Sequence, residues 1–177
     1  MTAGILIARA ALDIVLTAGD ESLPLETGGI LLGFRASDVI VATRALVVPD
    51  PRSSRHSYLL HGRRAQTLMA TARNETPAVV GYVGEWHTHP ADVPPSRTDE
   101  RALGAAARTA AGPIALVVPA YPASGPPRLH GLVALRRPWP LPAISPVDMV
   151  VTAVDVIDDT PNSLEAEATT LTEGKSP

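Results

Sequence analysis

Short apolar runs and segments of helical periodicity alternate along most of this chain. The continuous apolar run at residues 28–34 predicts a strand buried on both faces, and residues 79–89 predict a second buried strand. Residues 63–73 repeat apolar side chains at helical spacing, and residues 99–111 are rich in alanine and leucine, which favours a helix. Further strands are predicted at residues 4–8, 39–48, 114–118, 129–136 and 149–157, and a further helix at residues 10–18.

The order of these elements predicts one layered α/β domain, a mixed β-sheet flanked by helices, over residues 1–157. The chain has 177 residues with 45% apolar side chains, which is enough for one sizeable core. Residues 158–177 break the pattern, because they hold five acidic side chains, one lysine and mostly small polar residues. Such a composition predicts a disordered acidic C-terminal tail.

Composition excludes several classes of protein. A net charge of −3 argues against nucleic-acid binding, and the lack of cysteine excludes disulfides, thiolate metal sites and cysteine nucleophiles. No apolar run reaches the roughly 18 residues of a membrane span, and the N-terminus lacks the pattern of a secretory signal. We therefore expect a cytoplasmic protein with no membrane partner.

Two histidines at the end of a predicted buried strand carry the first chemical signal. His87 and His89 are two residues apart, so in a strand both imidazoles point to the same face. Imidazole nitrogens on a rigid strand suit zinc, although a pair of solvated histidines has the same spacing. Glu85 shares that face and is an alternative base or ligand.

Ser96 and Asp99 open the clearest predicted helix. Ser-x-x-Asp before an apolar periodic run is typical of a helix cap, with the serine at the N-cap. The same rigid helix start is also a suitable place for a third metal ligand. Two histidines and one carboxylate would leave a fourth position open, as in catalytic zinc sites.

The segment His-Thr-His-Pro, a short loop and Ser-x-x-Asp together resemble the JAMM motif of the JAB/MPN metalloproteases. The family also has a glutamate far upstream, and Glu26 stands at that place, before the apolar run 28–34. Over roughly residues 5–136 the chain is most similar to small bacterial JAB proteins. The loop of six residues between His89 and Ser96 is one shorter than is usual in the family. The resemblance implies the JAB/MPN (cytidine deaminase-like) fold.

The resemblance also implies a role for each motif residue. His87, His89 and Asp99 would bind Zn²⁺, Glu26 would take the proton of the attacking water, and Ser96 would stabilise the oxyanion. The family pattern favours Glu26 over Glu85 as the base. The other three histidines are expected to be structural or solvent-exposed, namely His56, His61 and His130.

The activity implied by the resemblance is that of a zinc-dependent isopeptidase or peptidase. It would cleave after the C-terminus of a ubiquitin-like protein, in deconjugation or precursor processing, including antiphage systems. The expected partners are a ubiquitin-like protein with its conjugates and the activating (E1-like) and conjugating (E2-like) proteins of the same pathway. The alternatives are a peptidase that acts on a sulfur-carrier protein and a catalytically silent scaffold module.

Overall fold

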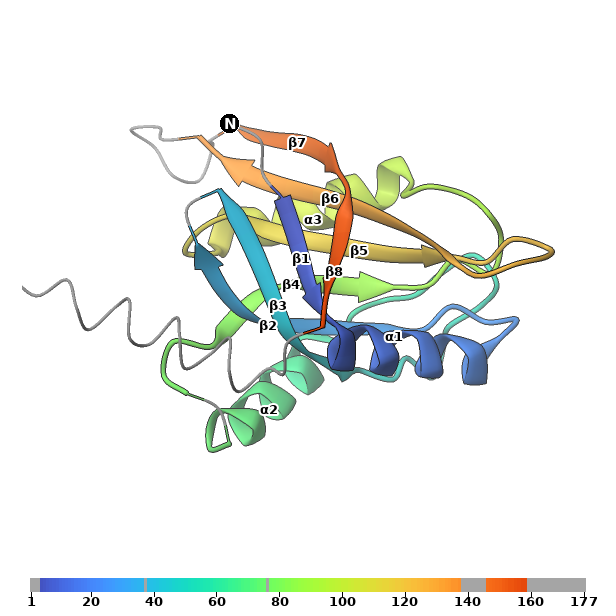
Figure 1. Cartoon of the computed structure of the whole chain (residues 1–177), viewed down its shortest axis with the longest axis horizontal. Helices are drawn as coiled ribbons and strands as arrows, with labels where there is room; N and C mark the ends of the chain where they lie inside the picture. The colour runs from blue at the N-terminus through green and yellow to red at the C-terminus, as the bar shows by residue number, and fades with distance from the viewer. Residues whose placement is uncertain (1–3, 37, 76, 138–145, 159–177) are drawn as a thin grey trace, which may run out of the picture.

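The computed structural model describes residues 4–36, 38–75, 77–137 and 146–158. Within these ranges the chain forms eight strands and three helices (Figure 1). In chain order these are β1 (Gly4–Ala8), α1 (Arg9–Ser22), β2 (Gly28–Ala36), β3 (Val39–Val47), α2 (Gly62–Arg73), β4 (Gly81–His87), α3 (Arg97–Thr109), β5 (Ile114–Ala120), β6 (Arg128–Arg136), β7 (Val147–Thr152) and β8 (Val154–Ile157). The predicted mixed α/β fold is confirmed, whereas the predicted tail at residues 158–177 lies, apart from Asp158, outside the described residues.

The eight strands form one mixed sheet in the order β7-β6-β5-β4-β2-β3-β1-β8. The sheet curves so strongly that its β8 edge returns over β6 (Figure 1). Gly131 of β6 lies directly beneath Ile5 of β1 and Val154 of β8, and a side chain there would clash with both. The curve therefore encloses a core between the two ends of the sheet.

One predicted strand is wrong. Residues 149–157 form two strands, because β7 ends at Thr152 and pairs antiparallel with β6, whereas β8 begins after Ala153 and pairs in parallel with β1. The chain thus crosses from one edge of the sheet to the other at a single residue. An alternating apolar pattern shows which residues face the core but does not identify the neighbouring strand.

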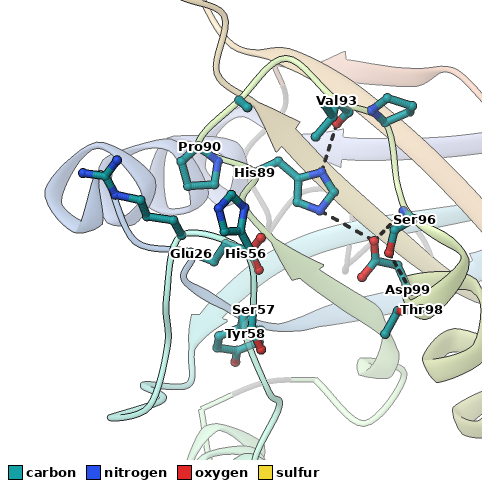
Figure 2. Close-up of a pocket in the computed structure, with 13 residues that line it drawn as sticks. Glu26, His56, Ser57, Tyr58, His89, Pro90, Val93, Ser96, Thr98 and Asp99 are labelled. Atoms are coloured by element: carbon teal, nitrogen blue, oxygen red, sulfur yellow. Dashed lines mark hydrogen bonds and ion pairs between the residues drawn. The ribbon is translucent and has the colours of Figure 1, made fainter.

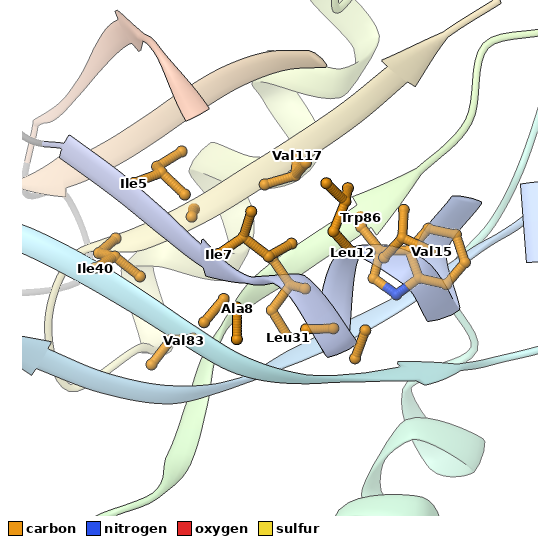
Figure 3. Packing of buried hydrophobic residues seen from close by; sticks show 14 of the residues in the cluster. Ile5, Ile7, Ala8, Leu12, Val15, Leu31, Ile40, Val83, Trp86 and Val117 are labelled. Atoms are coloured by element: carbon orange, nitrogen blue, oxygen red, sulfur yellow. The ribbon is translucent and has the colours of Figure 1, made fainter. Parts of the chain in front are cut away.

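Helix α1 packs into the concave face of the sheet. Its apolar face contributes Ala11, Leu12 and Val15, which pack against side chains from six strands (Figure 3). Trp86 of β4 is fully buried in this cluster, and its indole N–H donates to the Leu46 carbonyl at 3.3 Å. The residues of β4 alternate in direction, so Trp86 points into this core while its neighbours Glu85 and His87 face the opposite side.

Helices α2 and α3 cover the convex face. Leu103 and Ala107 of α3 pack on the apolar side chains of β5 and β6, and Ala65 of α2 packs on Ile30 and Leu32 of β2. None of the helices in the described ranges is long and apolar enough to span a membrane.

Strand pairing places the start of β2 beside the end of β4. The two strands are antiparallel, with Gly28 opposite His87. The pairing continues past the end of β4, because the backbone N–H of Thr88 donates to the Thr27 carbonyl at 2.8 Å and the hydroxyl of Thr88 accepts from the Thr27 N–H at 3.0 Å. Glu26 is therefore held next to the two histidines although about 60 residues separate them in the chain.

Candidate metal centre

Two histidines and one aspartate bring three ligand atoms together at the end of β4. The Nε2 atoms of His87 and His89 are 3.1 Å apart. Oδ1 of Asp99 is 3.4 Å from Nε2 of His87, and its Oδ2 is 3.6 Å from Nε2 of His89. The three side chains are between 9% and 17% exposed, so the cluster is shielded yet reachable.

The spacing of these atoms fits a tetrahedral metal ion. Zinc bonds of about 2.0–2.1 Å place neighbouring ligand atoms of a tetrahedron about 3.3 Å apart. The three observed distances, 3.1, 3.4 and 3.6 Å, lie on both sides of that value. Two imidazole nitrogens and one carboxylate are a donor set that zinc accepts, and three protein ligands leave its fourth position open.

A hydrogen bond to the following loop fixes the orientation of His89. Its Nδ1 lies 2.9 Å from the Val93 carbonyl, and a carbonyl can only accept, so Nδ1 carries the hydrogen. The lone pair of the neutral ring is then on Nε2, which faces His87 and Asp99. Burial disfavours the charged ring, but the hydrogen bonds to Asp99 and Val93 raise the pKa of His89 overall.

Asp99 is both a helix-capping residue and a member of the cluster. Its N–H donates to the Ser96 hydroxyl at 3.3 Å, while the Ser96 N–H donates to Asp99 Oδ2 at 2.6 Å. Burial disfavours the charged carboxylate, yet the hydrogen bonds from His87, His89 and Ser96 hold the pKa of Asp99 well below its usual range. The short loop at residues 90–95 has thus not moved Asp99 away from the histidines.

The cluster opens into a hollow of about 350 Å³, called here the Glu26 hollow. It is lined by Glu26, Arg55, His56, Ser57, Tyr58, His89, Pro90, Ala91, Val93, Pro94, Ser96, Thr98 and Asp99. Figure 2 shows Glu26 and Ser96 on opposite sides of His89. Glu26 is 8% exposed, and its backbone N–H donates to the Ser54 carbonyl at 2.8 Å. Burial raises the pKa of Glu26, although His87 and His89 act in the opposite direction.

The loop between β3 and α2 forms one wall of this hollow. Tyr58 stacks on His87 with ring centres 6.4 Å apart, and its hydroxyl donates to the Val48 carbonyl at 2.8 Å. Gly28 lies under the Tyr58 ring, where an added Cβ would come within 2.5 Å of it. Glycine at this position therefore permits the close approach of the loop to β2.

Asp50 closes the base of the same loop. Its carboxylate accepts from the N–H of Arg52 at 2.9 Å and of Leu59 at 3.0 Å, and lies 3.1 Å from His61 Nε2. The hydrogen bonds to Arg52, His61 and Leu59 lower the pKa of Asp50. The role of Asp50 could not be predicted from the sequence, because a Pro-Asp-Pro turn gives no sign of a hydrogen bond to a residue nine positions further on.

The contacts of Glu85, His56 and His61 separate these remaining candidate residues. Glu85 does not join the cluster of His87, His89 and Asp99, because its Oε1 accepts from the Tyr82 hydroxyl at 2.9 Å. His61 binds Asp50, as a structural residue would, and His56 is exposed, as expected, at the wall of the Glu26 hollow. Nothing in the apolar pattern could place His56 there, since its loop has no periodicity.

The curved mixed sheet and its cluster of two histidines and a carboxylate define a class of α/β domains with a candidate metal centre at the end of a central strand. The family model for prokaryotic homologs of the JAB domain matches residues 8–129, and the chain belongs to that family. The solution structure of a protein from Desulfitobacterium hafniense is similar in fold, with a TM-score of 0.63 and 17% identity, over 88% of this chain and 94% of the other. No curated protein matches the sequence.

Proposed function

We propose that this protein is a zinc-dependent peptidase or isopeptidase that cleaves after the C-terminus of a ubiquitin-like protein. The observation that carries the proposal is the convergence of His87, His89 and Asp99 beside a hollow that also holds Glu26 and Ser96. The class of substrate rests on the resemblance to JAB/MPN metalloproteases. A peptidase that acts on a sulfur-carrier protein would use the same site.

His87, His89 and Asp99 would hold the ion. Bound there, zinc supplies Lewis-acid chemistry, because it polarises a carbonyl and lowers the pKa of a water molecule from 15.7 to about 7. The hydrogen bond that His89 donates to the Val93 carbonyl and the one that Asp99 accepts from the Ser96 N–H keep the ligand atoms in place before the ion arrives.

Glu26 supplies the proton transfer in this mechanism. Its carboxylate takes a proton from the attacking water and later delivers it to the leaving amine. A buried carboxyl with a raised pKa is suited to both steps, since it holds the proton more firmly than an exposed glutamate. This assignment favours Glu26 over Glu85, whose Oε1 is occupied by Tyr82.

Ser96 supplies a hydrogen bond to the developing negative charge. Its Oγ already accepts from the Asp99 N–H, which leaves the hydroxyl hydrogen free to donate into the hollow. A donor that is fixed before the reaction stabilises an oxyanion without further reorganisation. The helix cap thus holds the donor in place.

The test is cleavage of a fusion in which a ubiquitin-like protein from the same organism carries a reporter peptide after its C-terminus. We expect the zinc-loaded protein to release the reporter, a chelator to stop the release, and added zinc to restore it. A parallel fusion of a sulfur-carrier protein distinguishes the two substrate classes. A zinc-loaded protein that cleaves neither fusion would instead favour the scaffold module.

A further inference from the structure

A second hollow, of about 320 Å³, adjoins the metal centre on the side away from Glu26. It shares Tyr58 and Asp99 with the Glu26 hollow, but His87 lines it where His89 lines the first. We call it the Glu85 hollow; it is lined by Tyr58, Leu59, Leu60, Gly62, Glu85, Trp86, His87, Asp99, Ala102, Leu103 and Leu116. A substrate that spans the metal centre would therefore extend into both hollows.

The walls of the Glu85 hollow are mainly apolar. Leu59 and Leu60 come from the loop before α2, Leu103 from α3 and Leu116 from β5. Leu59 is 63% exposed, whereas Leu103 and Leu116 are buried. A hollow with mainly apolar walls and a few polar groups is typical of a ligand-binding site.

Glu85 is the acidic group in this hollow other than Asp99, which belongs to the metal centre. The hydroxyl of Tyr82 donates to its Oε1 at 2.9 Å, which fixes the carboxyl group. Among the described residues no partner is found for Oε2, and this oxygen is not sealed from solvent. The mechanism proposed above does not use Glu85. Glu85 lines the hollow, and its Oε2 is thus left without a protein donor among the described residues.

We propose that the Glu85 hollow is a specificity subsite for a substrate side chain with an aliphatic stem and a terminal N–H donor, as in arginine or lysine. The proposal rests on the proposed peptidase function, because it places this side chain beside the scissile bond. The stem packs on the leucines, and the head donates to Oε2 of Glu85. Long basic side chains commonly bury their stems on apolar surface in this way.

The selection arises from the acceptor atom. A substrate with an apolar head would cover Oε2 without donating to it, and a buried acceptor that loses its water is costly. A site built around a hydrogen bond therefore strongly rejects a ligand of the same shape that lacks the donor. This discrimination is larger than that of an apolar pocket against one added methylene. Because only one oxygen is free, a single N–H suffices.

The experiment uses internally quenched peptides in which arginine, citrulline or norleucine occupies one position at a time on either side of the scissile bond. Citrulline keeps the N–H donors without the charge, and norleucine keeps an aliphatic stem alone. At one position, we expect the norleucine peptide to have a kcat/KM about tenfold to a hundredfold lower than the arginine and citrulline peptides. Binding of the same peptides to the Glu26→Gln protein, followed by fluorescence anisotropy, should show the same order without turnover.

Two variants test Glu85 itself. Glu85→Met removes the acceptor at nearly constant volume and should reduce the preference for a donor to about one. In Glu85→Met the Tyr82 hydroxyl loses its hydrogen-bond partner. The double variant Tyr82→Phe/Glu85→Met removes that hydroxyl as well and so controls for misfolding. Glu75→Gln changes an exposed glutamate after α2 and is the matched control.

The outcomes separate the two proposals. If the wild-type protein cleaves the peptides with no preference at any position, or keeps its preference in Glu85→Met, the subsite is wrong and the peptidase function stands. If no peptide is cleaved but the anisotropy shows a donor preference that Glu85→Met abolishes, the subsite stands, and the cleavage assay with the ubiquitin-like fusion decides the proposed activity. If neither cleavage nor binding shows a preference for a donor, the subsite is wrong, whether or not the peptides are cleaved.

Discussion

Replacing Glu26 by glutamine should separate catalysis from folding. The change keeps the shape of the side chain and removes its charge and its ability to accept a proton. Glu26 is 8% exposed in the hollow beside the cluster of His87, His89 and Asp99 and is not one of the three clustered ligands. We therefore expect the Glu26→Gln protein to fold and to bind zinc as the wild type does.

The cleavage rate and the stability should move in opposite directions. Loss of a positioned general base lowers the rate by about 10² to 10⁴, which is about 3–5 kcal/mol in the activation barrier. Burial raises the pKa of Glu26, so the folded chain disfavours the ionised form. In the zinc-free protein glutamine removes this penalty. The gain in stability should be absent below the unfolded pKa of about 4.3 and appear as the pH rises through the folded pKa.

The assay measures cleavage, zinc content and thermal unfolding on one preparation, with Glu85→Gln as the matched variant. On a substrate whose side chains lack a terminal N–H donor, Glu85→Gln should keep its rate within about tenfold, because the Glu85 carboxyl is bonded to Tyr82 outside the ligand cluster. Reversed roles would refute the reasoning: an active Glu26→Gln protein and an inactive, zinc-loaded Glu85→Gln protein would make Glu85 the base.

Three further predictions follow from the same contacts. Ser96→Ala should destabilise the fold by about 1 kcal/mol through the lost helix cap and slow cleavage about 10²- to 10³-fold. The zinc content should stay unchanged, because the backbone N–H of residue 96 still donates to Asp99. An unchanged cleavage rate would contradict the role of Ser96 as a donor. Asp50→Asn should lower the free energy of unfolding by about 1–2 kcal/mol at neutral pH. The lowered folded pKa of Asp50 means that this difference is full above about pH 4 and disappears as the pH falls, and a difference independent of pH in denaturant titrations would refute the assignment. Deleting residues 159–177 should leave the melting temperature and peptide cleavage nearly unchanged, and a marked loss of stability would show a docked segment.

Most of the fold could be predicted because its signals are local. The run 28–34 and the Ser-x-x-Asp helix start each combine an apolar pattern with residues that favour one element. The pattern at residues 149–157 is equally local, and it predicts extended backbone but not the division at Ala153 into two strands with different partners. Sheet pairing depends on residues far away in the chain, which a single sequence does not reveal.

The candidate site was predictable for a different reason. His87 ends β4 and His89 follows it in a single β-bridge to Ala120. Ser96 caps α3 and Asp99 lies in its first turn. Spacing alone therefore orients each pair, and the family pattern supplied Glu26. The loop that carries His56 and Tyr58 has no periodicity, and its position depends on the Asp50 hydrogen bonds and on Gly28. Those contacts join residues whose types are common in any surface loop, so the sequence could not identify them.

The zinc content of the purified protein tests most directly whether His87, His89 and Asp99 form a metal centre. After zinc loading and dialysis, elemental analysis of the wild-type chain should give close to one zinc ion per chain. Asp99→Ala and His89→Ala should each retain close to none, because two remaining ligands hold a tetrahedral ion poorly. A wild-type chain without zinc, or an Asp99→Ala chain with full zinc, would contradict the assignment and leave Asp99 as a helix-capping residue alone.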